Sequence, residues 1–481
     1  MPPWRFSSAG WVNWKSCWID EMSDPKVWRN RSPGDLSIEL DEVTTGDVAA
    51  AVKRSVTAWP DWKHTTLDER KDTLRKCQDR LRSRQEDLAR LIALEVGKPL
   101  REARLELGAV LAKFDLAFAD ADRFVADRVV EDGPHPAMVR HRSRGPAAVI
   151  APFNFPIHLG HGAAVAYLLA GNTVLFKPSP LAASVGAAYA AEMMAVLPAG
   201  VFELVQGGGE IGRELCLHQT VRAVCFTGSV PVGTMLAKEL AEDYSKSLAL
   251  ELGGINSLIV CADADLDKAA LAAADAMCLT TGQRCNATSR IFLDKRIERA
   301  FLERFLASLQ RYQPGDPLDE DTMLGPLVSE TAVQRHAKFL STSTHNVLSG
   351  EIVPVVGGKR GHFVKPAVLL NTGGESALNH EAFCPVAEVR TFAHSDEVVF
   401  HQAAQPHGLT ASVFCRSREA FHAMGDRLEV GNLYWNLPTT FSPSTLPFGG
   451  LRASGNGRPG GRGFIRFAAE EQALQWLASE E

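Results

Sequence analysis

RAVCFTGSVPVGTMLAKELA, residues 222–241, joins a short apolar run to a helical pattern through a turn that contains glycine. The run 222–226 has the length and composition of a buried strand, and residues 232–241 have those of a helix. The same alternation recurs on both sides, and it predicts another helix at 184–196 and strands at 147–151, 173–176, 201–205, 248–251 and 257–260. Short strands that alternate with helices are typical of a parallel, doubly wound sheet covered on both faces, so the fold class is α/β.

The turn after strand 222–226 is a candidate phosphate site. Gly228, Ser229 and Gly233 stand where a helix begins, and free backbone N–H groups at such a position suit a phosphate, although serine is also a routine helix N-cap. Residues 207–212, GGGEIG, satisfy the glycine fingerprint of dinucleotide-binding folds. That fingerprint requires an acidic residue about 20 positions later, where this chain has TGS. A tight strand-to-helix turn therefore explains residues 207–212 at least as well as a phosphate cradle.

The flanking regions form further units. Thr66 and Glu69 have the spacing of a capping box, and leucines then recur on one helical face until Gly97. Another helix is expected at 101–125. A second α/β unit follows at 262–445, with a helix near 296–312 and strands from 362 onward, before a glycine-dense tail. An extended N-terminal arm anchored by buried tryptophans is expected from Trp4, Trp11, Trp14, Trp18 and Trp28.

Composition excludes several classes of protein. The chain has 481 residues, so at ~150 residues per domain two or three units are expected. Hydrophobic residues make up 45% and charged residues 22%, which is ordinary for a globular protein. The net charge is −6 and no dense basic run occurs, so no nucleic-acid partner is expected.

Targeting and metal signals are also missing. No apolar run approaches the ~18 residues of a membrane span, and the N-terminus lacks the apolar run of a signal peptide. The 9 cysteines are odd in number and never form a C-x-x-C pair, which disfavours a disulfide framework and a zinc site. We therefore expect no metal, no membrane contact and a cytoplasmic location.

Three segments carry candidate chemistry. Cys285 ends the polar turn GQRC, where a nearby cation can favour a thiolate. Glu251 ends an apolar strand in LELGG, where burial can raise the pKa of its carboxyl into the range of a general base. Asn154 stands between two prolines in PFNFP, a rigid place for a donor to an oxyanion. Taken alone, each could be a plain structural residue.

Together these segments identify a resemblance to the aldehyde dehydrogenase superfamily over residues 35–470. The matches occur in one order and with the family's spacing: PFNFP, LFKP with Lys177, FTGS, LELGG, GQRC, HEAFCP with Glu381 and Phe383, and PFGG with Phe448. The resemblance implies a Rossmann-type cofactor unit (1–125 and 145–250), an α/β catalytic unit (251–445) and oligomerisation or bridging elements (126–144 and 446–481). It also implies a homodimer or homotetramer.

The resemblance further implies residue roles. Cys285 would attack a small aldehyde, Asn154 would hold the oxyanion, and Glu251 would activate water. The cofactor, NAD or NADP, would be held by Phe153, Lys177, Ser179, Gly228, Ser229, Gly233, Leu252, Glu381 and Phe383. Pro180 stands where NAD-preferring members commonly carry a glutamate, so use of NADP is consistent with the sequence.

Within the family, segments 432–436 and 444–459 resemble the succinylglutamate semialdehyde dehydrogenases of arginine breakdown. This implies a carboxylated semialdehyde such as N-succinylglutamate 5-semialdehyde. Candidate substrate residues are Arg284, Ser444, Thr445 and Phe448. A role as an exposed, solubilising arginine explains Arg284 equally well, and Phe448 taken alone is better explained as a core aromatic. A CoA-acylating dehydrogenase, another semialdehyde dehydrogenase and an inactive scaffold of the same fold remain as alternatives.

Overall fold

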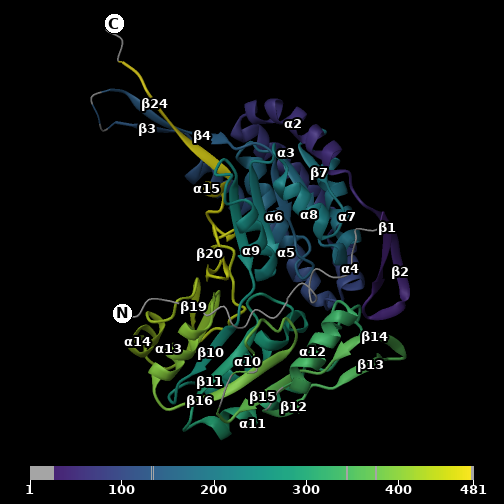
Figure 1. Ribbon diagram of the computed structural model, residues 1–481, viewed down its shortest axis with the longest axis vertical. Helices are drawn as coiled ribbons and strands as arrows, with labels where there is room; N and C mark the ends of the chain where they lie inside the picture. The colour runs from purple at the N-terminus through teal and green to yellow at the C-terminus, as the bar shows by residue number, and fades with distance from the viewer. Residues whose placement is uncertain are drawn as a thin grey trace.

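Two large sheets form the framework of the computed structural model, which describes residues 26–477 apart from 132, 134, 343, 344, 374, 375 and 377. In Figure 1 the first sheet and its helices lie in the upper half of the molecule, and the second sheet lies below. Trp28 lies in β1 (Val27–Ser32), which pairs with β2 (Asp35–Thr44), whereas the other tryptophans of the expected arm lie outside the described residues.

The first sheet is the expected doubly wound sheet. Its strand order is β22-β9-β8-β5-β6-β7, and the five strands from β9 to β7 are parallel to one another. The bounds are β5 (Ala147–Ile150), β6 (Val174–Lys177), β7 (Phe202–Leu204), β8 (Ala223–Gly228), β9 (Ser247–Leu252) and the short antiparallel β22 (Gly455–Asn456). The chain passes from β5 through β6 to β7 on one side of β5, and it then returns to form β8 on the other side of β5. The strand order therefore reverses between β5 and β8, and such sheets bind ligands at the carboxyl ends of the strands beside this point.

The sixth predicted strand is not in this sheet. Residues Asn256–Val260 form β10 of a second sheet, with the order β12-β15-β16-β11-β10-β18-β19. Only 253–255 separate β9 from β10, and a parallel neighbour in one sheet needs a crossover of about a dozen residues or more. The other strands are β11 (Thr288–Asp294), β12 (Asn346–Ser349), β15 (Ala367–Asn371), β16 (Val386–Phe392), β18 (Thr410–Phe414) and β19 (Asn432–Trp435).

Helices cover both faces of each sheet. The first sheet is covered by α2 (Val48–His64), α3 (Leu67–Ser83), α4 (Gln85–Val96), α5 (Leu100–Phe124), α6 (His158–Leu169), α7 (Ala183–Met194), α8 (Gly209–Leu217) and α9 (Val230–Glu239). The second sheet packs with α10 (Leu266–Cys278), α11 (Glu298–Leu309), α13 (Ser395–Ala404) and α14 (Arg418–Gly425). Helix α12 (Glu330–Thr342) and the hairpin of β13 (Ile352–Val356) and β14 (Lys359–Val364) lie beside it.

The helical run expected from Thr66 to Gly97 is two helices. The capping box of Thr66 and Glu69 is present at the start of α3, but the helix ends at Ser83 and α4 begins after Arg84. Arg84 leaves the helical conformation at φ −109° and ψ 10°, and its guanidinium pairs with Glu192 of α7. The leucine pattern could not show the break because both helices turn the same face to the core.

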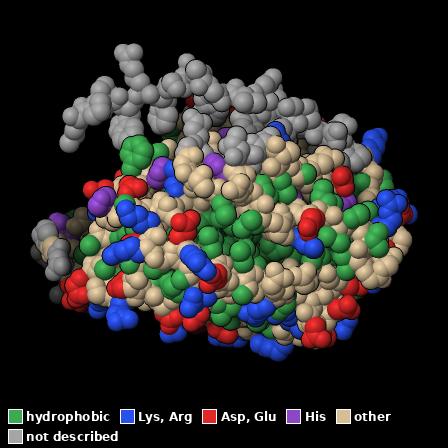
Figure 2. Space-filling view, turned by 90° about the horizontal axis from the view of Figure 1, so that it is seen from below, with side chains coloured by type: hydrophobic (Ala, Val, Ile, Leu, Met, Phe, Trp, Pro, Cys, Tyr) green, Lys and Arg blue, Asp and Glu red, His purple; other side chains and the backbone are tan. Residues whose placement is uncertain are grey.

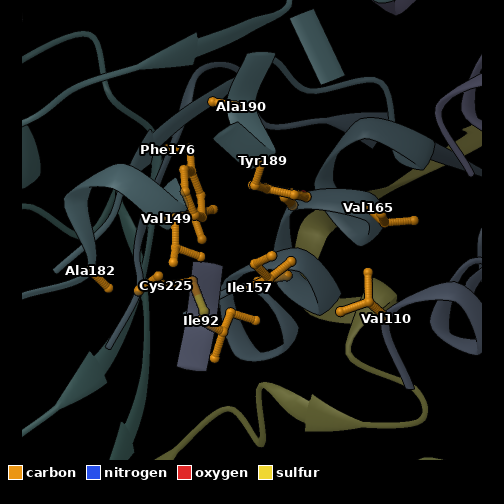
Figure 3. Close-up of a cluster of buried hydrophobic side chains, with 14 of the residues drawn as sticks. Ile92, Val110, Val149, Ile157, Val165, Phe176, Ala182, Tyr189, Ala190 and Cys225 are labelled. Atoms are coloured by element: carbon orange, nitrogen blue, oxygen red, sulfur yellow. The ribbon is translucent and has the colours of Figure 1, made fainter. Parts of the chain in front are cut away.

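Alternating residues of the strands supply two separate cores. Ala147 and Val149 of β5 pack under α3–α7, whereas Ala148 and Ile150 pack under α2, α8 and α9. Figure 3 shows the first of these cores, in which side chains of α4–α7 meet those of β5, β6 and β8. Because successive strand residues point to opposite faces, a run of apolar residues is required on a sheet covered twice.

A small third sheet projects from the molecule. The expected hairpin consists of β3 (Arg128–Val130) and β4 (Ala137–Ser143), and the C-terminal strand β24 (Ala469–Gln475) pairs with β4 along its whole length. Figure 1 shows this sheet extending away from both units. The strand β20 (Pro447–Phe448) and the helix α15 (Ile465–Ala468) lie on the part of the chain that leads from the second sheet to this small sheet. Short pairings of β17 (His407–Gly408) with β21 (Leu451–Arg452), and of β20 with β23 (Gly460–Gly461), complete that path.

The molecular surface mixes charges of both signs. On the face seen in Figure 2, blue and red side chains are interspersed around a central area of apolar side chains. Among the described residues, no helix is both long and apolar enough to cross a membrane.

Candidate active site

Cys285 follows an unusual turn between α10 and β11. Helix α10 ends at Cys278, and Thr280, Thr281 and Gly282 then take positive φ angles of 54°, 55° and 68°. A left-handed conformation costs a non-glycine residue about 1–2 kcal/mol. Gly282 has no such cost, and its Cα faces the backbone of Cys384, where a Cβ would lie 2.4 Å from the carbonyl carbon. The turn therefore needs support from its surroundings.

Asn256 anchors the chain on the other side of Cys285. Its Nδ2 donates to the carbonyl of Cys285 at 2.8 Å and to that of Ala287 at 2.9 Å, while its Oδ1 accepts from the N–H of Thr410 at 3.1 Å. Asn256 is buried at the start of β10. One amide side chain thus connects the backbone of Cys285 to the second sheet by hydrogen bonds.

The thiol of Cys285 lies among opposing charges. Burial raises its pKa well above the usual range, and the charges of Glu251 and Glu381 raise it further, whereas Arg284 and the N–H of Asn286 lower it. The residue as a whole keeps some solvent contact. The thiol is therefore neutral in this environment and needs a base before it can attack a carbon.

Glu251 is the predicted base, and its surroundings are unusual for a carboxyl group. It lies on β9 opposite Thr227 of β8 and Gly455 of β22, is only 1% exposed, and neither carboxylate oxygen has a hydrogen-bond partner. Burial raises the pKa of this carboxyl to about 8, and Arg458 opposes the shift. A buried carboxyl group without a partner is costly to maintain, which is typical of a catalytic site.

Asn154 closes the third side of the site. It is buried in the loop between β5 and α6, and its Nδ2 donates to the carbonyl of Gln283 at 2.7 Å. A side-chain amide carries two N–H donors. One of them holds the turn that precedes Cys285, and the other can serve an oxyanion.

The predicted cofactor residues of the first sheet lie at the carboxyl ends of its strands. Gly228 ends β8, Leu252 ends β9, and Lys177 is buried at the end of β6. Ser229 is the N-cap of α9, but its side chain makes no capping hydrogen bond, and Gly233 allows α9 to approach Leu252. The free hydroxyl, the helix N-terminus and the buried cation fit the phosphates and riboses of a dinucleotide.

Ser179 follows Lys177 and has a structural contact of its own. Its Oγ accepts from the N–H of Leu181 and so caps the short 3-10 helix Pro180–Ala182. The carbonyl of Pro180 accepts from Nδ2 of Asn30 at 2.8 Å.

Two further predicted residues lie in the segment before β16 of the second sheet and contact loops at the carboxyl ends of the first sheet. The Oε1 atom of Glu381 accepts from the N–H of Gly254 at 3.2 Å, and burial raises the pKa of this carboxyl to about 8. Phe383 takes a positive φ of 49°, and its ring lies edge-on to that of Phe153, with 5.8 Å between centroids. The first contact joins the HEAFCP segment to LELGG, and the second joins it to PFNFP.

The predicted substrate residues differ in their exposure to solvent and in their contacts. Phe448 is buried in β20, Ser444 is half-buried and Thr445 is exposed in the preceding loop. Phe441 of that loop packs edge-on against Tyr434, and burial, followed by the nearby Cys285, raises the pKa of Tyr434. The guanidinium of Arg284 is already bonded to Glu102 and Thr280, so a substrate carboxylate would compete with Glu102 for it.

Sequence reasoning missed three buried residues around the site: Asn256, Glu102 and Glu106. Asn256 follows LELGG after a single residue, and a polar residue at the head of an apolar strand was an available signal. The two glutamates lie in a helix among arginines, where they look like part of a solvated face. Only the packing of α5 shows that they are inside.

Comparison with known proteins shows the family of the chain. Residues 18–474 match the Aldehyde dehydrogenase family. The chain belongs to this family. N-succinylglutamate 5-semialdehyde dehydrogenase of Caulobacter sp. (strain K31) is 33% identical over 450 residues, which cover 92% of this chain and 89% of that protein.

Two solved structures extend the likeness to the fold. The NAD-dependent aldehyde dehydrogenase of Sinorhizobium meliloti is 30% identical with a TM-score of 0.89, over 94% of this chain and 91% of that one. An NADP dependent enzyme of E. coli is 29% identical with a TM-score of 0.88, over 94% and 95% of the two chains. The protein is an aldehyde dehydrogenase with the fold of that family.

Proposed function

We propose that this aldehyde dehydrogenase uses Cys285 as nucleophile, Asn154 as oxyanion donor and Glu251 as general base, with NAD or NADP as its cofactor. The observation that carries this assignment is the buried, unpartnered carboxyl of Glu251, whose charge acts on the Cys285 thiol. Three segments distant in sequence thereby meet around one position.

In the first half of the reaction a carbon–sulfur bond forms. Cys285 loses its proton to a base, and its sulfur attacks the aldehyde carbon. The carbonyl oxygen becomes an oxyanion, which the second N–H of Asn154 and the backbone N–H of Cys285 stabilise. When bound, the nicotinamide supplies the two-electron acceptor for the hydride that leaves this carbon. A thioester on Cys285 remains.

In the second half Glu251 takes a proton from water, which attacks the thioester carbon and breaks the carbon–sulfur bond. The products are a carboxylic acid and the free cysteine. A CoA-acylating enzyme would transfer the acyl group to a thiol instead and would not need this base. Product analysis with and without CoA decides between the two, and a product that is acid in both cases supports hydrolysis.

Asn154→Ala should lower kcat by about 100- to 1000-fold, the usual cost of one oxyanion donor. The nucleotide affinity should stay near that of the wild type, because the Asn154 amide faces the Gln283 carbonyl and the Cys285 turn. Steady-state kinetics and calorimetry measure the two quantities. A variant with unchanged kcat would remove Asn154 from the mechanism.

The cofactor is held by the predicted residues at the strand ends: Ser229 and Gly228 at its phosphates, Lys177 and Glu381 at its riboses, and Phe383 beside the nicotinamide. Pro180→Glu should move the preference toward NAD by at least ~10-fold in the ratio of kcat/KM values, because a carboxylate beside a 2′-phosphate costs several kcal/mol. Assays with both nucleotides measure the ratio. An unchanged ratio would place the 2′ position away from residue 180.

The substrate we propose is a carboxylated semialdehyde such as N-succinylglutamate 5-semialdehyde. Its support is the likeness to N-succinylglutamate 5-semialdehyde dehydrogenases across nearly the whole chain and the polar loop with Ser444 and Thr445. A panel of semialdehydes with and without a distal carboxylate, assayed at 340 nm with NAD and with NADP, tests it. Higher kcat/KM for uncarboxylated aldehydes would contradict it.

The proposal also includes the boundaries of the structural units and the assembly of subunits. We propose residues 1–125 and 145–250 as the nucleotide-binding unit and 251–445 as the catalytic unit. Residues 1–25 lie outside the described part of the chain, and the boundary at 250/251 falls within β9 of the first sheet. Val129 of the projecting sheet is an exposed apolar side chain, and so are Trp476 and Leu477, which directly follow β24. We propose that this sheet joins subunits of a homodimer or homotetramer in the cytoplasm.

A further inference from the structure

Helix α5 carries two buried glutamates one turn apart. The side chain of Glu102 is 2% exposed and that of Glu106 is fully buried. Residues four apart lie on the same helical face. Both carboxylates therefore point into the protein from one rigid element, behind the loops that carry Cys285 and Asn154.

Glu102 holds the turn that leads to the nucleophile. Its carboxylate accepts from the N–H of Thr280 at 3.0 Å and from Oγ1 of Thr280 at 2.8 Å. It also accepts from Nη2 of Arg284 at 2.8 Å, while Nε of Arg284 donates to Oγ1 of Thr280 at 2.9 Å. These bonds hold Thr280 in its positive-φ conformation and fix both ends of the turn before Cys285. A strained residue persists only where its surroundings determine it in this way.

Glu106 holds the other loop. Its Oε1 accepts from the N–H groups of Ile157 and His158, both at 3.1 Å, at the start of α6. Its Oε2 accepts from Nζ of the buried Lys98 at 2.5 Å. Because Ile157 and His158 follow the PFNFP segment directly, this carboxylate fixes the end of the loop that presents Asn154.

Phe155 joins the two halves. Its ring lies between two cations, with Nζ of Lys98 3.7 Å and Cζ of Arg284 5.0 Å from the ring centroid. Cation–π contacts are strongest where the cation is shielded from water. Each cation is neutralised by its own glutamate, so the two ion pairs and the ring form one buried network that is neutral as a whole.

We propose that Glu102 and Glu106 are positioning residues that set the Cys285 thiol and the Asn154 amide at their working separation, with α5 as the common support. The inference rests on the roles proposed above for Cys285 and Asn154. Neither glutamate contacts those two side chains, and each acts through the backbone of the loop it holds. The two carboxylates hold different loops, so their losses should have different signatures.

The test compares Glu102→Gln and Glu106→Gln with Glu192→Gln. Glu192 is a suitable control because its side chain is 9% exposed and paired with Arg80 and Arg84, far in sequence from both loops. Four quantities are measured on the full chain: kcat, the affinity for NAD by calorimetry, the thermal midpoint, and the rate of alkylation of Cys285 by iodoacetamide. Peptide mapping follows Cys285, with the buried Cys225 as the marker of global unfolding.

In both Glu102→Gln and Glu106→Gln, kcat should fall by ~10- to 100-fold, because a displacement of about 1 Å can cost ~100-fold, while NAD affinity is retained. Alkylation of Cys285 should become faster in Glu102→Gln. Burial is the main cause that raises the pKa of this thiol, and the turn should bury it less once Glu102 no longer holds it. The alkylation rate should be unchanged in Glu106→Gln. Cys225 should stay unlabelled. Glu192→Gln should keep its kcat and alkylation rate even if its thermal midpoint falls.

Unchanged kcat in both variants would overturn the inference, and so would equal alkylation rates in Glu102→Gln and the wild type. If Glu102→Gln does not fold, Thr280→Val takes its place: it removes the hydroxyl contacts and keeps the Glu102–Arg284 ion pair. It should show the same two changes at smaller size, and their absence would be equally decisive. Full activity of Cys285→Ala would instead refute the proposed function, so the two failures are distinguishable.

Discussion

Cys285→Ala should abolish aldehyde oxidation, leaving no growth of absorbance at 340 nm with any semialdehyde and either nucleotide. The carbon–sulfur bond is the only covalent link between protein and substrate in the proposed reaction, and without it no thiohemiacetal carbon exists to release a hydride. Six other thiols among the described residues are too buried to substitute. Cys77, Cys216, Cys225, Cys278, Cys384 and Cys415 are buried, and burial raises the pKa of Cys384, the thiol of the HEAFCP segment, to about 12.

Cys261→Ser is the matched control. Cys261 is the other half-buried thiol among the described residues, and it follows β10 on the side of the second sheet where α14 packs. This variant should keep full activity. Calorimetry should show that Cys285→Ala still binds nucleotide, which separates loss of chemistry from loss of fold. Residual steady turnover in Cys285→Ala would mean that another group forms the covalent intermediate.

The position of four candidate site residues could be predicted from the sequence because it follows from topology. Asn154, Lys177, Ser229 and Glu251 each follow or end a short apolar strand. In a parallel sheet those ends share one edge. Once the strands were recognised, their terminal polar residues had to meet, and the structure places them at that edge. Cys285, which precedes a strand of the other sheet, was placed only by the family's motif order.

Features that depend on tertiary packing were not predictable in this way. The periodicity of α5 marks its apolar face, but Glu102 and Glu106 are buried by the loops that fold over them, which no local pattern records. Tertiary packing also explains why the contacts of Arg284 could not be predicted from the sequence. In the sequence it is a cation beside the nucleophile and a candidate for the substrate, whereas in the structure Glu102 occupies it. The turn at 280–282 was also invisible, since two threonines give no signal for positive φ.

Glu251→Gln should separate the two halves of the reaction. The first turnover should still produce reduced nucleotide as a burst, because attack and hydride release can proceed when another base or solvent removes the thiol proton. Hydrolysis should then slow by about 100- to 10,000-fold, the range of general-base contributions, so a thioester accumulates on Cys285. Stopped-flow absorbance measures the burst, and mass spectrometry of the quenched enzyme detects the acyl group. Steady turnover at the wild-type rate would exclude Glu251 as the base.

The pH profile gives an independent test of the same carboxyl. Burial raises its pKa to about 8, so below that pH most of it is protonated and cannot accept a proton from water. The rate of hydrolysis in the wild type should therefore rise with pH and level off above about 8, which is the sign expected for a base that must be ionised. Glu251→Gln should lose this dependence, whereas Glu192→Gln should keep it. An ordinary carboxyl pKa near 4.5 in the hydrolysis profile would mean that Glu251 is solvated in the working enzyme, contrary to its burial here.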